Sequence, residues 1–286
     1  MKKHLIWAAA SAALLASCAK EETQTFTPAA TDLPQASITF VAEENADFTR
    51  AFFDNTTTTE AWEQSLSSLT VFCFEEGALV MRRNFTSAEL SSRRSTFALP
   101  RSTAGKSIEF YALANAAVDE NITTKTALLA LTEETPGSYN GTFANVSSKA
   151  LRSGGFLMSG TATKSIGAAG TTTEVAITLR RDVAKVAVQA SLSPAFADKY
   201  PGTVRITSVK LSRSAMQTPY FGGTPKTGAM TFTHTQTPGE TSGRFNALFY
   251  CFENAALASG SRVLLTLDGV YDRDGKTSTT SDQVPI

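Results

Sequence analysis

Short apolar runs rich in Val, Ile, Phe and Thr recur along the chain between turn-forming residues, a pattern that predicts strands rather than helices. The runs cover residues 36–42, 69–74, 78–85, 95–99, 106–114, 174–179, 184–189, 204–211, 245–252 and 263–271. Within 184–189, Ala184, Val186 and Val188 share one face and polar residues take the other, the period of a half-buried strand. The pattern predicts an all-β fold of sandwich type.

Helical periodicity is scarce. Only residues 58–66 and 125–131 have the composition for a couple of helical turns. Two prolines and Gly202, within residues 194–202, interrupt the strand pattern and mark an expected domain boundary.

The N-terminus has the features of an export signal. Lys2 and Lys3 precede an apolar run over residues 5–16, which is too short to cross a bilayer core. The run ends in Leu-Ala-Ser-Cys18, which resembles a bacterial lipoprotein box, where cleavage precedes a cysteine that is then lipidated. We therefore expect a signal peptide over 1–17, lipid (palmitate) on Cys18, and a polar tether after it.

The other two cysteines lie in apolar, strand-like surroundings. Cys73 and Cys251 are therefore expected to be buried thiols. A disulfide between them stays an alternative in an exported protein, although they are far apart in the sequence.

Charge and histidine content narrow the functional classes. The 286 residues contain 26 Lys and Arg against 26 Asp and Glu, so no basic surface for nucleic acid is expected. Of two histidines, His4 lies in the signal, which leaves His234 alone and argues against histidine metal sites and catalytic triads. We expect no catalytic residues, no metal and no cofactor.

Three local patterns resemble sites without completing them. Gly275-Lys-Thr lacks the earlier glycine of a phosphate loop, because position 270 is Val270. Residues 272–275 are better explained as a hairpin turn than as a calcium loop. The acidic pairs at 75–76 and 133–134 are better explained as solvated loop residues than as glycosidase carboxylates, so a secreted hydrolase is the weakest class.

Arg50 is the first arginine in the chain. It follows an acidic link at 43–47 and precedes Ala51, a setting that suits cleavage by an Arg-specific, trypsin-like protease. Taken alone, an ordinary loop arginine is the better explanation.

The order of motifs along the chain favours cleavage at Arg50 over an ordinary loop arginine. The lipoprotein box, the early strand, Arg50-Ala-Phe and the run 69–74 occur in the order found in fimbrillins, the major subunits of the type V pilus, which this chain resembles from end to end. Further matching segments follow at 110–115, 155–160, 177–186, 203–222 and 249–254. The resemblance implies two transthyretin-like β-sandwich domains, 51–192 and 193–286, in a structural and adhesive protein without catalytic activity.

The resemblance also implies assembly by strand exchange. Ile38 and Phe40, in the pro-segment 18–50, would fill a groove in the first domain until cleavage after Arg50. A C-terminal strand from the next subunit would then enter the groove, giving a head-to-tail polymer. The implied partners are other pilus subunits, the protease, and the cell outer membrane through the lipid before cleavage. The mature protein would lie in the fimbrium at the cell surface.

The chain departs from the family beyond residues 282–286, where fimbrillins continue into further strands. The second domain is thus expected to be incomplete, by truncation or because the subunit accepts a strand without donating one. Two alternatives keep the lipid: a membrane-retained surface lipoprotein that binds glycan or host protein, and an anchor subunit of the pilus.

Overall fold

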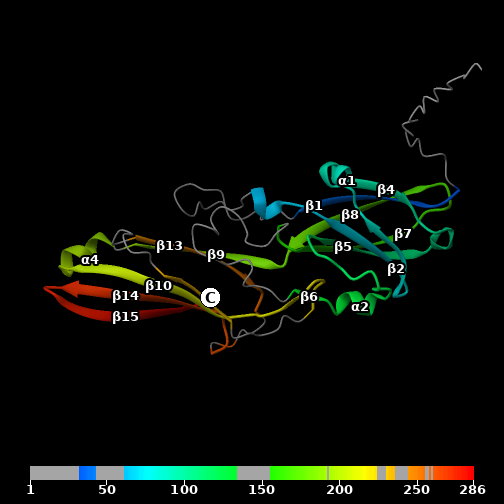
Figure 1. Cartoon of the computed structure of the whole chain (residues 1–286). Coiled ribbons are helices and arrows are strands. Elements are labelled where there is room, and N and C mark those ends of the chain that lie inside the picture. Colours follow the sequence, from blue (N-terminus) through cyan, green and yellow to red (C-terminus); the bar gives the residue numbers. More distant parts are fainter. Residues whose placement is uncertain are drawn as a thin grey trace, which may run out of the picture.

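The computed structural model describes residues 32–42, 61–133, 155–191, 193–223, 230–235, 244–254, 258 and 260–286. Within them strands dominate and helices are short, so the predicted all-β fold is confirmed (Figure 1). The strands are β1 (Gln35–Ala42), β2 (Leu69–Glu75), β3 (Ala78–Asn84), β4 (Arg94–Ala98), β5 (Ser107–Ala114), β6 (Thr132–Glu133), β7 (Met158–Ser165), β8 (Thr172–Arg181), β9 (Val183–Ser191), β10 (Thr203–Ser214), β11 (Thr218–Pro219), β12 (Met230–Thr235), β13 (Arg244–Phe252), β14 (Leu264–Arg273) and β15 (Lys276–Pro285). The helices are η1 (Ala61–Gln64), α1 (Ser87–Ser92), η2 (Arg101–Thr103), α2 (Lys125–Leu129) and α4 (Pro194–Lys199).

The first group of strands forms a seven-stranded sheet in the order β3-β2-β5-β7-β8-β1-β4. Its pairs are antiparallel except for β1 with β8, which is parallel. The ladder between β7 and β8 has only two residue pairs, Met158 with Arg181 and Ser159 with Arg180. The sheet folds over on itself, so that β1, β4 and β8 face β2 and β5 across a shared core.

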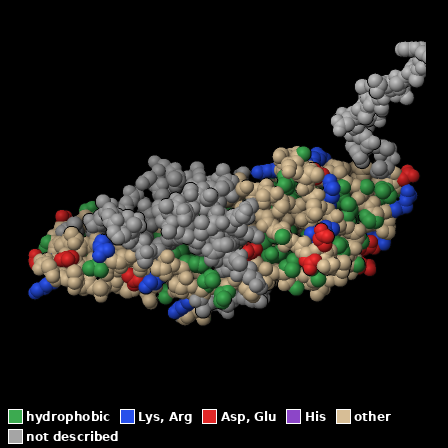
Figure 2. Space-filling view, in the orientation of Figure 1, with side chains coloured by type: hydrophobic (Ala, Val, Ile, Leu, Met, Phe, Trp, Pro, Cys, Tyr) green, Lys and Arg blue, Asp and Glu red, His purple; other side chains and the backbone are tan. Residues whose placement is uncertain are grey.

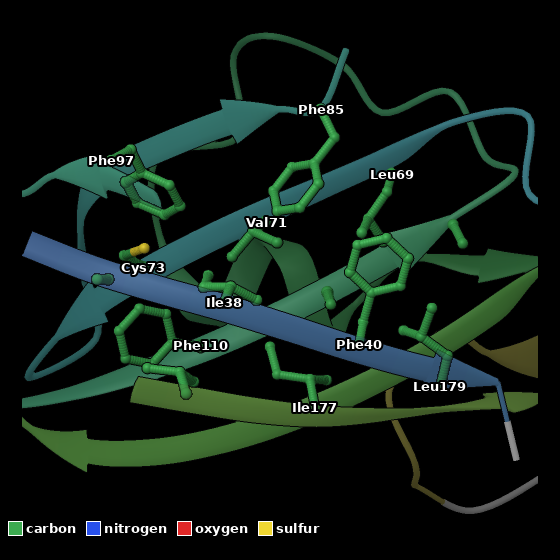
Figure 3. Close-up of a cluster of buried hydrophobic side chains, with 14 of the residues drawn as sticks. Ile38, Phe40, Leu69, Val71, Cys73, Phe85, Phe97, Phe110, Ile177 and Leu179 are labelled. Atoms are coloured by element: carbon green, nitrogen blue, oxygen red, sulfur yellow. The ribbon is translucent and has the colours of Figure 1, made fainter. Parts of the chain in front are cut away.

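One hydrophobic core lies between the two layers of this folded sheet (Figure 3). It takes buried side chains from β1, β4 and β8 in one layer and from β2 and β5 in the other. The alternating burial along β8, with Val175, Ile177 and Leu179 inward, is the two-residue period of a strand with one buried face. The sandwich predicted from the sequence pattern is therefore present here.

The second group consists of a four-stranded sheet, in the order β12-β10-β14-β15, and the antiparallel pair β13-β9. Val188 from β9, Val209 and Leu211 from β10, and Phe249 from β13 form its core. Asp274 and Gly275 have φ values of 56° and 73° and join β14 to β15 as a tight hairpin, the turn that was predicted there.

Among the strands that the sequence pattern did not predict, β7 and β15 were missed for a physical reason. β7 and β15 consist largely of Ser, Thr and Lys, and most of their side chains are exposed or half-buried. They are held by ladders to β5 and β14 rather than by an apolar face, so hydrophobic periodicity cannot detect them.

The predicted domain division at residue 192 stays a prediction. β9 lies within the predicted range 51–192 but pairs along its whole length with β13. This pairing favours a boundary between the two groups of strands just before β9. Because β1 belongs to the first sheet, the first unit extends back to residue 35.

Cys73 and Cys251 are free, buried thiols, as the sequence pattern predicted. Burial raises the pKa of Cys73 to about 12 and that of Cys251 to about 11. Both thiols are therefore protonated at neutral pH and poorly reactive.

A buried carboxylate joins the two groups of strands. Glu63 in η1 is 2% exposed, and its carboxylate lies 2.7 Å from Lys185 Nζ on β9 and 3.8 Å from the guanidinium of Arg181. Tyr250 on β13 donates a hydrogen bond of 2.5 Å to the same carboxylate. β6 pairs with β11 in a second connection between the groups.

Replacing Glu63 with Ala should destabilise the chain strongly, because it removes a buried anion that faces two cations. We expect a loss of about 3 kcal/mol and a fall in Tm of roughly 10 °C. Glu120→Ala, at an exposed position, should change stability by less than about 0.5 kcal/mol. Thermal unfolding followed by circular dichroism measures both, and an equal Tm for the two variants would contradict a joining role for Glu63.

Candidate functional site

The candidate site is the position of β1 within the first sheet. β1 lies between two strands, parallel to β8 along its whole length and antiparallel to β4 over residues 35–39. Residues 43–60, which connect it to η1, are outside the described part of the chain. β1 thus forms main-chain ladders on both sides without being part of a hairpin with either neighbour.

The inward face of β1 closes the core. Ile38 and Phe40 are fully buried, with Ala36 and Ala42 at the two ends of the same face. Figure 3 shows Ile38 and Phe40 pointing from the β1 ribbon toward the opposite layer. The ring of Phe40 meets that of Phe85 edge to face, with centroids 5.6 Å apart. These side chains provide the apolar contacts that would be lost if β1 left.

Removal of β1 would open a groove between β4 and β8. In the sheet order β4 is the edge strand and contacts the rest of the sheet through β1. Both groove walls would then present unpaired N–H and C=O groups over an exposed core, a strong template for another strand. In the structure, the chain's own strand β1 occupies this position and pairs with both neighbours.

One wall of the groove has its own attachment to the fold. Glu89 in α1 accepts a hydrogen bond from Ser95 on β4 and forms an ion pair of 2.8 Å with Arg83 on β3. The backbone N–H of Thr86 donates to the same carboxylate at 2.7 Å, which completes a capping box. β4 is therefore tied to β3 and α1 independently of β1.

The structure places the predicted site residues unequally. Ile38 and Phe40 lie in the core as described above. Cys18, Arg50 and Ala51 lie outside the described residues, so lipidation and cleavage stay predictions. The sequence analysis missed Ser37 and Arg94, which contact each other across the outer face of β1. No signal marked them, because a serine in a strand and an arginine after a helix are both commonplace.

The patterns that resembled enzyme sites have structural explanations. Glu75 ends β2 and pairs with Lys106, and Glu76 lies in the turn to β3 with a φ of 49°. Glu133 is buried in the short strand β6, so the expectation that it is a solvated loop residue is wrong. Within the described ranges, no group of three or more His, Cys, Asp or Glu residues is placed to hold a metal ion. Helices long and apolar enough to span a membrane are likewise absent from these ranges.

Comparison with known proteins assigns the family. The sequence profile of the fimbrillin-A associated anchor proteins Mfa1 and Mfa2 matches residues 31–283, which is most of the chain. The chain belongs to this family. The earlier inference of a fimbrillin-type subunit is thus confirmed. No curated protein matches the chain.

Solved structures of the same fold support the architecture. A putative cell adhesion protein from Parabacteroides distasonis has a TM-score of 0.62 at 15% identity, with 90% of this chain and 82% of that one covered. A putative cell adhesion protein from Bacteroides eggerthii gives 0.56 at 16%, covering 88% and 79%. A fimbrilin from Porphyromonas gingivalis gives 0.55 at 14%, covering 89% and 82%. At these identities the likeness establishes the fold alone.

Truncating Phe40 should reveal how much β1 contributes to the core. Phe40→Ala removes a fully buried ring from the layer interface, and we expect a loss of about 3–5 kcal/mol in the free energy of unfolding. Val41→Ala is the matched control, because Val41 is 53% exposed on the same strand. Urea unfolding measures both, and equal midpoints would show that β1 does not close the core.

The pH dependence of stability tests the attachment of β4. Burial raises the pKa of Glu89, but hydrogen bonds from Ser95, Thr86 and Arg83 outweigh it and lower this pKa to about 2. The contribution of Glu89 is complete above its unfolded pKa near 4.3 and is lost as pH falls toward 2. The stability gap between the native chain and Glu89→Gln should therefore shrink between about pH 4.5 and 2. A pH-independent gap would contradict the assignment.

Proposed function

We propose that the chain is a fimbrial subunit in which β1 is a temporary occupant of the groove between β4 and β8. The protein would be exported as a lipoprotein precursor, cut after Arg50, and joined to a neighbouring subunit by exchange of β1 for a strand of that neighbour. One observation carries the proposal: a strand from the N-terminal side of the undescribed segment 43–60 completes both the ladder and the core of the first sheet.

After cleavage at Arg50, β1 would no longer be covalently linked to the rest of the chain and would be held as a bound ligand. Arg50 lies between β1 and η1, so a cut there severs the link through which β1 reaches the rest of the chain. β1 would then be retained only by its two ladders and its buried side chains. A strand of similar pattern can replace both sets of contacts, which is the physical basis of β-strand addition.

Exchange between copies would produce an open polymer. The groove belongs to one subunit and the incoming strand to another, so the contact is heterologous and does not close on itself. The protein would act structurally and in adhesion, without catalysis or cofactor. Family membership supports this coarser role of pilus subunit or adhesin.

Before cleavage, lipid on Cys18 would hold the precursor at the cell outer membrane, where an Arg-specific, trypsin-like protease would act on it. After cleavage the residues 18–50 would leave with the lipid, and the mature chain would enter the fimbrium at the cell surface.

An anchor subunit is the second candidate. The matching family is described as containing anchor proteins, which favours a subunit that keeps its lipid and holds the fibre at the membrane. In that case Cys18 stays attached to β1 and Arg50 is not cut. The same N-terminal features serve both candidates, so processing is what separates them. A surface lipoprotein that binds glycan or host protein would also keep its lipid.

The N-terminus of the surface protein distinguishes these candidates. We expect Ala51 as the first residue of protein recovered from fibres, and Arg50→Ala should leave lipidated monomer and abolish incorporation into polymer. Arg101→Ala, at an exposed arginine of the described region, serves as the control and should not alter processing. N-terminal sequencing and immunoblotting of sheared fibres measure both. A lipidated Cys18 on all surface material would refute cleavage and support the two candidates that keep the lipid, the anchor subunit and the surface lipoprotein.

A further inference from the structure

The outer face of β1 carries one side chain that is buried without pointing into the core. Ser37 is 0% exposed, whereas Val41 on the same outer face is 53% exposed. Gln35 and Thr39, the other outward residues, are half-buried. A neighbouring side chain on the outer face of the sheet must therefore cover Ser37.

The cover is the guanidinium of Arg94 on β4. Its Nε and Nη2 donate to Ser37 Oγ at 3.0 and 2.8 Å. Nη2 also donates to Glu174 Oε1 on β8 at 2.9 Å. β4 and β8 are the two walls of the groove, so this ion pair crosses over β1 from one wall to the other.

The register explains why the crossing passes over Ser37. Arg94 is opposite Thr39 on β1, while Glu174 is opposite Ser37. Arg94 must therefore extend diagonally across the outward positions of β1 to reach the carboxylate. A small residue at position 37 leaves room for that path, and its hydroxyl provides an acceptor on the way.

We propose that Arg94 and Glu174 form a bridge that selects the strand allowed in the groove. The groove accepts a partner subunit's strand with a small inward residue, then Ser or Thr under the bridge, then inward residues of the size of Ile and Phe at alternate positions. This inference rests on the proposed strand exchange and names the chemistry of the incoming strand. The core beneath the groove would select the inward side chains of the strand, and the bridge would select the outward one.

Side-chain size is the main selective element. A Leu at the position of Ser37 would occupy the path of Arg94, so the bridge and both hydrogen bonds to the strand would be lost. Ala would lose only the hydrogen bonds, and Arg94 is 54% exposed, so water can replace that acceptor in part. We expect Leu to be excluded more strongly than Ala.

β15 of a second copy does not fit these requirements. It runs Lys-Thr-Ser-Thr-Thr-Ser-Asp-Gln-Val-Pro from Lys276 to Pro285. Neither of its faces offers large apolar side chains at two successive alternate positions, as Ile38 and Phe40 do on β1. The proposal is therefore for a strand of different composition from β15.

Peptide binding to the cut chain tests the selection. A specific protease sequence placed within residues 43–50 allows cleavage of the whole folded chain, and a fluorescent peptide of residues 35–42 then competes for the groove. We expect Ser37→Thr in the peptide to bind within about threefold of the original, and Ser37→Leu to bind at least about tenfold more weakly. On an Arg94→Ala chain, the original and Ser37→Leu peptides should bind within about threefold of each other. A peptide of residues 276–285 should not bind.

The outcomes separate the two proposals. If the original and Ser37→Leu peptides bind the native groove equally, the bridge does not select, although strand exchange stands. Tight binding of the 276–285 peptide would overturn the stated strand pattern. If no peptide binds, exchange at this groove is refuted.

The intact chain provides an independent measurement. In the uncut protein, Ser37→Leu should lower Tm in the native background and lower it much less in an Arg94→Ala background. Glu174→Gln is the matched partial variant, since it removes the ion pair and leaves the contact of Arg94 with Ser37. Additive losses in Ser37→Leu, Arg94→Ala and the double variant would refute the bridge without bearing on cleavage or polymerisation.

Discussion

The first sheet depends on β1 being hydrogen-bonded on both sides while it fills the core beneath. Its parallel ladder to β8 and antiparallel ladder to β4 are what place β4 in the sheet. Its inward side chains pack in the core between the two layers. A segment that joins the rest of the fold through residues outside the described part thus contributes to backbone pairing and apolar packing at once. If β1 left, the backbone pairing and the apolar packing would be lost together.

Sequence reasoning recovered what depends on local apolar periodicity and missed what depends on contacts between distant elements. The apolar run 36–42 predicted a strand there, and the family resemblance implied that Ile38 and Phe40 fill a groove. The structure places a strand at Gln35–Ala42 and both side chains in the core. Nothing local specified that β1 runs parallel to β8, since neighbour and direction are set by the folded sheet. Nothing in the sequence around Glu63 indicated that it would contact Lys185 and Tyr250, which lie more than a hundred residues away in the chain. Ser37 owes its burial to Arg94 rather than to its own polarity.

Similarity to other proteins adds to this account at two different levels. The match to the family of fimbrillin-A associated anchor proteins covers most of the chain and assigns the family. The solved structures of the same fold are only 14–16% identical to the chain, so they support the sandwich architecture and leave individual side chains to be argued from this molecule.

The two-sided pairing of β1 also has a mechanical consequence. In a fibre joined through this groove, tension between subunits would pull the inserted strand along its own axis. The ladder hydrogen bonds lie across that axis, so they would be sheared together rather than opened one after another. A short strand in this geometry resists a pulling force far better than the same strand peeled from a sheet edge. The attachment of β4 through Glu89 would keep one wall in place under such a load.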